Sequence, residues 1–367
     1  MKPILKYLKD LFASQRVIGL DTDLSGLVRA DALLQSLIDA KKVPGLAITL
    51  LKNGNTIFQK GYGYADWDVK KPVDPRRTIF RIASVSKPIA ATALANMVSD
   101  GLMDLDTSFY HYVPYYPKKK YDFTIRQLAS HTAGIRGYKG KEYALNVPYS
   151  IKESLAVFKD DDLLFKPGTN YFYNSYDWVM ISLAMQEASG IPFENYVQQK
   201  VLRPLNLKNT FPETAAVSTK EHINDSEIAV FYSKTRSGFR KAIPVNNFYK
   251  MAGGGYLSTS EDIAQLGMAY LDQKITDKTI LSQFLTSEIL NGAPTYYGLG
   301  WQVSMDKTGK PYYGHIGNGV GGYSNFFVYP DEQTVVVILM NCTDPKVQKE
   351  LDEAISNLVL HMEKPNT

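Results

Sequence analysis

Several features that would place this chain in a common protein class are absent. With one cysteine among 367 residues, no intramolecular disulfide can form, and no cysteine–histidine cluster has the spacing of a zinc site. No apolar run approaches the roughly 20 residues that a membrane-spanning helix needs. A formal net charge of +4 is small for this length and gives no reason to expect a nucleic-acid partner. What remains is a chain long enough for one large or two modest domains with a substantial core.

The amino-terminal residues 1–12 also lack the pattern of an export signal. Lysines interrupt what would have to be the apolar core of a signal peptide, and no small-residue cleavage site follows. We therefore expect a cytoplasmic protein, or a periplasmic or extracellular one if an export signal was removed before the numbering begins. The lone Cys342 ends an apolar run and is expected to be buried and structural.

The amino-terminal part of the chain carries clear local patterns. Apolar spacing predicts a helix over residues 24–40. Two strands are expected at 46–51 and 56–60, joined by Asn53-Gly54, a strong signal for a hairpin turn.

The middle and the end of the chain differ in character. Residues 106–275 read mainly as helices and loops, with helices expected at 151–158, 175–189, 193–201 and 260–272. Strand patterns return at 298–305, 311–316, 322–329 and 333–341. A final helix is expected from Asp344-Pro345, a capping residue followed by a proline.

These patterns predict one antiparallel sheet built from both chain ends and covered by the terminal helices. Residues 20–105 and 276–367 would form this discontinuous α/β domain. Residues 106–275 would form an inserted, mainly helical domain, and a cleft is expected where the two meet.

The segment 84–87, Ser-Val-Ser-Lys, is the first candidate for chemistry. A serine hydroxyl needs a neighbouring base to become a nucleophile, and Lys87 shares a helix face with Ser84. Pro88 is tolerated only in the first turn of a helix, so it places Ser84 at a helix start, where unpaired N–H groups favour an oxyanion. The segment 304–307 has the same spacing, so the four letters alone are weak evidence.

A hydrolase also needs a proton shuttle. None of the five histidines lies in a Gly-x-Ser-x-Gly element, so a histidine triad is not indicated. Tyr173 follows a Pro-Gly turn and precedes an apolar helix, and a nearby ammonium could lower its pKa or let it relay a proton. On composition alone, a packed aromatic is the commoner role for such a tyrosine. His131 is expected to make a structural hydrogen bond.

The segment 313–323 ends a strand in glycines, which lets a substrate backbone approach closely. The backbone N–H of Asn318 is a candidate second oxyanion donor beside that of Ser84. Taken alone, this segment is better explained as a glycine-rich hairpin turn with a surface histidine.

Taken in order, these segments resemble the serine β-lactamase-like family, which includes class C β-lactamases, D-alanyl-D-alanine carboxypeptidases, D-aminopeptidases and family VIII esterases. The similarity covers about residues 43 to 341. Family-like stretches lie at 80–87, 124–135, 204–210, 252–259 and 297–301. The resemblance implies a β-lactamase/transpeptidase-like α+β fold, with an antiparallel sheet flanked by terminal helices and an inserted all-helical domain.

The resemblance also implies roles for the reacting residues. Ser84 would be the acylated nucleophile, Lys87 its partner, and Tyr173 the general base and acid. The N–H groups of Ser84 and Asn318 would form the oxyanion hole, and no metal or organic cofactor would be needed.

Two departures from the family pattern bear on the substrate. Ser175 stands where β-lactamases usually have an asparagine, and a hydroxyl offers fewer hydrogen bonds. His315-Ile316-Gly317 stands in place of Lys-Thr-Gly, and a histidine gives a weaker, pH-dependent positive charge. We expect these four residues to bind the substrate. The literal Lys-Thr-Gly at 307–309 is a decoy in a charged turn.

The sequence therefore predicts a serine hydrolase that cleaves a peptide, amide or ester bond of a small-molecule or peptide substrate through an acyl-enzyme. Its motifs most resemble the mitochondrial members of the family, and β-lactams are expected to be poor substrates. The alternatives are a class C-type β-lactamase, or a penicillin-binding or self-assembling protein with little turnover. The sequence does not decide whether the chain forms a homo-oligomer.

Overall fold

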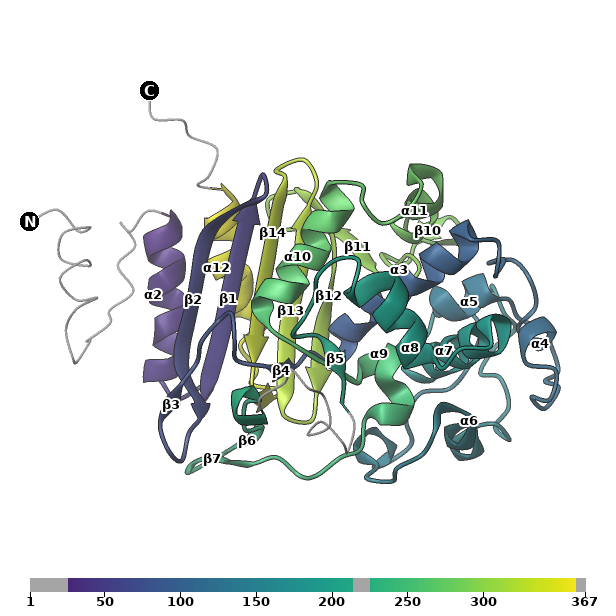
Figure 1. Cartoon of the computed structure of the whole chain (residues 1–367), viewed down its shortest axis with the longest axis horizontal. Helices are drawn as coiled ribbons and strands as arrows, with labels where there is room; N and C mark the ends of the chain where they lie inside the picture. Colours follow the sequence, from purple (N-terminus) through teal and green to yellow (C-terminus); the bar gives the residue numbers. More distant parts are fainter. Residues whose placement is uncertain (1–25, 214–224, 361–367) are drawn as a thin grey trace, which may run out of the picture.

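The structure, a computed structural model, describes residues 26–213 and 225–360 (Figure 1). The amphipathic segment 1–12 and the outer ends of the expected sheet domain lie outside the described residues. A seven-stranded sheet runs in the order β11-β12-β13-β14-β1-β2-β3, and every neighbouring pair is antiparallel. Its strands are β1 (Gly45–Lys52), β2 (Asn55–Asp66), β3 (Lys71–Pro72), β11 (Gln302–Met305), β12 (Pro311–Gly319), β13 (Gly322–Tyr329) and β14 (Thr334–Met340).

The centre of the sheet joins the two ends of the chain. β1 pairs with β14 in a register that runs from Leu46 opposite Met340 to Lys52 opposite Thr334. All seven residues of β14 are buried, because alternate side chains of this strand enter the two cores on opposite faces of the sheet. The predicted antiparallel sheet made from both chain ends is confirmed.

One face of the sheet is covered by the two terminal helices of the described chain, α2 (Gly26–Asp39) and α12 (Gln348–Leu360) (Figure 1). They pack against each other, and an ion pair of 2.6 Å between Arg29 and Glu353 joins them. Their apolar stripes meet the sheet face that includes Ile338.

The last helix begins later than expected. It starts at Gln348 rather than at Pro345, because Asp344 and Lys346 take left-handed backbone angles, with φ of 38° and 58°. A residue with positive φ cannot continue a right-handed helix. The segment thus turns twice before the helix forms.

The other face of the sheet is covered by α10 (Ser260–Leu271), which packs on β1, β13 and β14 (Figure 1). A Cβ on Gly267 would lie 2.7 Å from a methyl of Val335, so a glycine is needed where this helix touches the sheet. α10 comes from the range 106–275 that was expected to form the helical insertion, yet it lies on the sheet. The domain boundaries at 105 and 276 stay a prediction.

The remaining helices gather beside the sheet, on the right of Figure 1. The two longest are α3 (Ser86–Ser99), which is buried over most of its length, and α7 (Tyr176–Ser189). The shorter ones are α4 (Phe109–Tyr112), α5 (Ile125–Ala129), α6 (Ile151–Ser154), α8 (Phe193–Val197), α9 (Met251–Gly254) and α11 (Lys278–Phe284). Within the described ranges, no helix is long and apolar enough to cross a membrane.

Small sheets connect these parts. Their strands are β4 (Phe80–Arg81), β5 (Phe211–Pro212), β6 (Tyr232–Thr235), β7 (Gly238–Lys241), β8 (Tyr256–Ser258), β9 (Ile289–Leu290), β10 (Ala293–Pro294) and β15 (Cys342–Thr343). Cys342 is fully buried, as expected. The pairing of β4 with β8 holds in place the chain directly before Ser84.

Candidate active site

Ser84 lies in a short 3-10 turn, η1 (Ala83–Val85), which leads into α3 at Ser86. The position of Pro88 predicted this start. Ala83 has a left-handed φ of 45°, an unfavourable angle for a residue with a side chain. Such strain persists only where the surroundings hold it. Here Ile82 O accepts a hydrogen bond of 2.7 Å from Ser324 Oγ on β13.

Three polar atoms converge at this turn. Lys87 Nζ lies 3.1 Å from Ser84 Oγ and 2.8 Å from Tyr173 Oη. Tyr173 Oη in turn lies 2.9 Å from Ser84 Oγ. The lysine also donates to Gly253 O at 2.8 Å, which orients its amine. The three residues that the sequence proposed for the chemistry are thus in mutual hydrogen-bond contact.

The side chain of Lys87 is fully buried, and this burial changes its chemistry. Burial lowers the pKa of Lys87 to about 7; the carboxyl of Asp177 opposes this shift and the charge of Lys250 adds to it. At neutral pH much of the lysine is therefore a neutral amine. Its lone pair can accept the proton of the Ser84 hydroxyl.

The pKa of Tyr173 shifts in the opposite direction to that of Lys87. The tyrosine ring is 38% exposed, but its hydroxyl points inward between Ser84 and Lys87, where burial raises the pKa of Tyr173 above its usual value. The suggestion that a neighbouring lysine lowers this pKa is therefore wrong. A phenol that stays protonated can still relay a proton between its two neighbours. The geometry favours Lys87 as the resting base and Tyr173 as the relay.

A buried histidine–aspartate pair packs against the ring of Tyr173. His131 Nδ1 lies 2.7 Å from Asp177 Oδ2, and both side chains are fully buried. Burial lowers the pKa of His131 well below its usual value and raises that of Asp177. The imidazole ring packs 4.6 Å from the ring of Tyr173, centroid to centroid. This is the structural hydrogen bond expected for His131, and it holds the ring on which Tyr173 rests.

The opposite wall of the site is β12. The amide of Ile316 points away from β13, because it donates to Gln302 Oε1 at 3.1 Å. Amides two residues apart in a strand point the same way, so the N–H of Asn318 also points away from β13, into the pocket that both Asn318 and Ser84 line. This orientation suits the second oxyanion donor, a role that stays a prediction.

Gly317 permits the close contact between β12 and the Ser84 turn. A Cβ there would lie 2.5 Å from Ile82 O and 2.2 Å from Ser324 Oγ. Such distances do not occur between real atoms, so a larger residue would push the strand away from the nucleophile. Gly317 therefore sets the width of the site and does not itself line the pocket.

His315 does not act as expected. Its ring is 1% exposed and outside the pocket lining, with Nδ1 2.7 Å from Ile316 O and Nε2 3.0 Å from Tyr297 Oη. Burial, aided by the charge of Lys87, lowers the pKa of His315 to about 3. The pH-dependent positive charge expected here is therefore wrong. The Ile316 side chain is also misassigned, since it packs toward the α2–α12 core.

The cavity beside Ser84 has a volume of about 360 Å³. Ser175 lines it, as expected. Two cationic residues that sequence reasoning missed, Arg81 and Lys250, also line it. The one available signal was their place inside or next to the family-like stretches 80–87 and 252–259.

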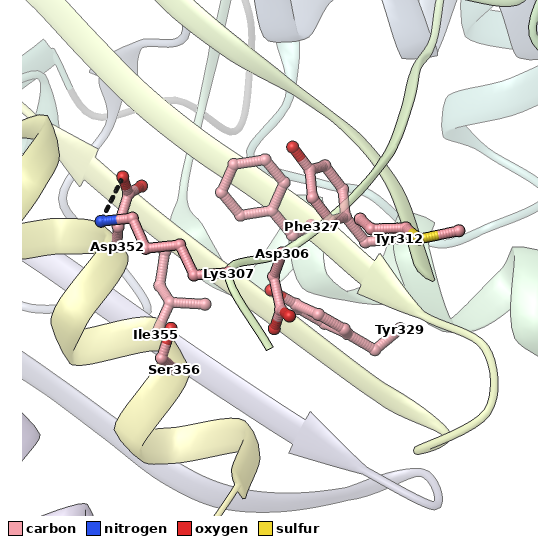
Figure 2. A pocket seen from close by; sticks show the side chains of 9 residues that line it. Asp306, Lys307, Tyr312, Phe327, Tyr329, Asp352, Ile355 and Ser356 are labelled. Carbon is pink, nitrogen blue, oxygen red and sulfur yellow. Dashed lines mark ion pairs between the residues drawn. The ribbon is translucent and has the colours of Figure 1, made fainter. Parts of the chain in front are cut away.

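The second serine–lysine pair lies elsewhere, on the α12 side of the sheet. Figure 2 shows Lys307 there, in a pocket lined by Tyr312, Phe327 and Asp352 among others. The side chain of Lys307 is 66% exposed and lies 3.7 Å from Asp352 Oδ2. Among the described residues, no hydrogen bond links Lys307 to Ser304 or to a tyrosine hydroxyl, so its interpretation as a decoy is supported.

No group of three or more histidine, cysteine, aspartate or glutamate side chains could hold a metal ion in residues 26–213 and 225–360.

Comparison with known proteins gives a consistent set of similarities. The β-lactamase family model matches residues 30–360. The chain is 26% identical to the human mitochondrial serine β-lactamase-like protein LACTB, a similarity that covers 82% of this chain and 71% of that protein.

Two solved structures share the fold. The octameric penicillin-binding protein homologue from Pyrococcus abyssi aligns with a TM-score of 0.78 and 24% identity, covering 92% of this chain and 77% of that one. A D-amino acid amidase from Ochrobactrum anthropi aligns with a TM-score of 0.78 and 20% identity, covering 91% and 100%.

Proposed function

The chain belongs to the β-lactamase family, and from this premise we propose that it cleaves an amide, peptide or ester bond through an acyl-enzyme on Ser84. One observation carries the proposal. Ser84 Oγ, Lys87 Nζ and Tyr173 Oη lie within 3.1 Å of one another, and Ser84 lines a cavity. A nucleophile in contact with a neutral amine and a phenol has the groups that acyl transfer requires.

In the first half of the reaction, the neutral amine of Lys87 accepts the Ser84 proton, directly or through Tyr173. Ser84 Oγ then forms a bond to the carbonyl carbon of the substrate. The N–H groups of Ser84 and Asn318 would stabilise the oxyanion, and a single donor of this kind typically contributes about 3 kcal/mol. The intermediate collapses as the bond to the leaving nitrogen or oxygen breaks, and the ammonium of Lys87 returns the proton to the leaving group.

In the second half, a water molecule takes the place of the leaving group. The neutral amine accepts a proton from this water through Tyr173, and the hydroxide attacks the acyl carbon. The ester bond to Ser84 breaks, and the serine regains its proton. The same residues therefore serve both halves, and none of these steps uses a metal.

The choice of amide and ester substrates rests on two points. Ser175 and the neutral, buried His315 offer little to a β-lactam carboxylate where the family pattern has an asparagine and a lysine. One structural neighbour is a D-amino acid amidase, which supports this substrate class for the present chain. The octameric neighbour supports self-association as an additional property, which light scattering would measure.

Labelling by a fluorophosphonate probe tests the nucleophile. We expect the wild-type protein to be labelled once and Ser84→Ala not at all, because the probe reacts only with an activated serine. Ser304→Ala, which removes the serine of the second pair, is the matched control and should label as the wild type does. Labelling of Ser84→Ala at the wild-type rate would refute the assignment.

Turnover is measured separately with short para-nitrophenyl esters. Continuous release of nitrophenolate supports a hydrolase. A single burst followed by a stable acyl adduct in the intact mass would favour a penicillin-binding protein with little turnover.

A further inference from the structure

The cavity beside Ser84 contains a cation that the mechanism does not use. Lys250 lines this cavity together with Ser84, yet its side chain comes from the segment directly before α9, far along the chain from the nucleophile. The residue is only 7% exposed. A lysine is seldom buried to this extent without a partner.

The hydrogen bonds of Lys250 are incomplete. Its Nζ donates to Tyr143 O at 2.8 Å and lies 5.4 Å from the ring centroid of Tyr138. An ammonium has three protons to donate, and among the described residues this is the one hydrogen bond recorded for Lys250 Nζ. Two donors of a buried cation therefore remain available in a cavity that also holds the nucleophile.

The neighbouring cation is already satisfied. Arg81 donates to both carboxylate oxygens of Glu213, at 2.6 to 3.0 Å, and to Val320 O at 2.8 Å. Glu213 also accepts from Asn247. Arg81 and Glu213 thus neutralise each other, whereas Lys250 contacts no carboxylate in the part of the chain that the structure describes.

We propose that Lys250 is a carboxylate-binding residue of this cavity, and that the preferred substrates carry a carboxylate a few bonds from the carbonyl that Ser84 attacks. This rests on the proposed function, since it concerns the substrate of the same site. A carboxylate would accept the two free protons of Lys250, and hydrogen bonds between charged groups are the strong ones in a buried setting. The position of the carboxylate, on the acyl side or on the leaving-group side, is decided by experiment.

The other charges around the cavity shape its pH dependence. Arg81, which is paired with Glu213, and Asp344, which is paired with Lys346, also line the cavity. Burial lowers the pKa of Lys250 to about 8; the charge of Arg81 adds to this shift, and Glu213 opposes it. The preference for a carboxylate should therefore be full at pH 7 and decline as the pH rises through about 8.

Two pairs of esters separate the two positions of the carboxylate. On the acyl side, para-nitrophenyl hemisuccinate is compared with para-nitrophenyl butyrate, which has the same length without the charge. On the leaving-group side, O-hippuryl-phenyllactate is compared with its amide. In one of the two pairs we expect kcat/KM at pH 7 to be about tenfold higher for the anion, the size expected of one charge-assisted contact.

Lys250→Met tests the residue itself. It should abolish that preference, mainly through KM, so that the charged and the neutral ester of the pair have about equal kcat/KM values. The readout is this ratio, because the charge of Lys250 also lowers the pKa of Lys87, and its loss affects both esters of a pair alike. Lys278→Met, which removes an exposed lysine on α11, is the matched control and should change neither ratio. Should Lys250→Met fail to fold, the wild-type preference measured from pH 6 to 10 gives the same answer, because Lys87 affects both esters of a pair equally.

Each outcome is decisive. Hydrolysis of the neutral esters without a preference for either anion overturns the role of Lys250 and leaves the proposed function standing. A preference that survives in Lys250→Met, or that does not decline above pH 8, also overturns it. No Ser84-dependent hydrolysis of any of the four esters refutes the proposed function, and this inference with it.

Discussion

The chain contains two serine–lysine pairs of identical spacing, and they lie in different local structures. Ser84 and Lys87 lie on a turn and the first turn of a helix, so their side chains meet at 3.1 Å. Ser304 lies in β11 opposite Tyr312, and Lys307 lies in the turn after this strand. A strand and a turn do not place residues three apart on one face.

Burial separates the two pairs even more than spacing does. Lys87 has no exposed surface and contacts Tyr173 and Gly253, whereas two thirds of the Lys307 side chain is exposed to solvent beside Asp352 (Figure 2). Burial penalises the charged form of Lys87 and so favours its neutral amine. The two pairs thus share a spacing and differ in burial, and the burial of Lys87 is what suits it to the proposed role of base.

The largest test of this difference exchanges the two lysines for methionine in turn. Lys87→Met removes the base and should lower kcat/KM for a neutral ester by about 10²–10⁴-fold, the usual contribution of a general base. Lys307→Met should leave it unchanged within about twofold. Steady-state kinetics with para-nitrophenyl butyrate measures both, with circular dichroism to show that each variant is folded. Equal losses in the two variants would remove the distinction between the pairs.

The two tyrosines beside these pairs allow a second comparison. Tyr173→Phe removes the hydroxyl that links Ser84 to Lys87 and should lower kcat/KM by about 10²-fold, the lower end of the range for proton transfer. The effect is smaller because Lys87 still contacts Ser84 directly. Tyr312→Phe, next to Ser304, should have no effect on the same assay. If Tyr173→Phe retains full activity, the phenol is only a packed aromatic.

The smallest expected effect is the pH dependence. Only the neutral amine can take the serine proton, so kcat/KM of the wild type should rise about tenfold between pH 6 and pH 8, through the pKa of Lys87 near 7. The sign comes from a lysine whose pKa is lowered: the active form is the one present above it. A flat profile across this range would contradict Lys87 as the base. The residual kcat/KM of Lys87→Met should not show this rise between pH 6 and pH 8.

Much of the sheet was predictable because its signals are local. The turn at Asn53-Gly54 and the unbroken apolar run of β14 depend on neighbours along the chain. The late start of α12 was not predictable, because Asp344-Pro345 is a sound helix start by sequence, whereas Asp344 and Lys346 take left-handed angles in the structure.

In the site, the residue types were predictable from the sequence. The burial, pKa and position of several of these residues were not. The sequence suggested a charged role for His315, but the structure buries this ring against Tyr297, and its pKa falls to about 3. It gave no role to Lys250, which the fold brings into the cavity of Ser84. The pKa shift of a buried group depends on how completely all the surrounding segments exclude water from it. A local sequence pattern does not show which distant segments pack there.

The sequence by itself determined the Ser84–Lys87 pair, since a proline in the first helical turn and a spacing of three residues are enough to fix it. The tertiary structure alone decided that Tyr173, 86 residues beyond Lys87, completes the contact. It also decided that Lys87 is fully buried, which lowers its pKa to about 7, whereas the side chain of Lys307 is 66% exposed. The physical reason is that spacing acts along one segment, whereas burial arises only where distant segments pack together.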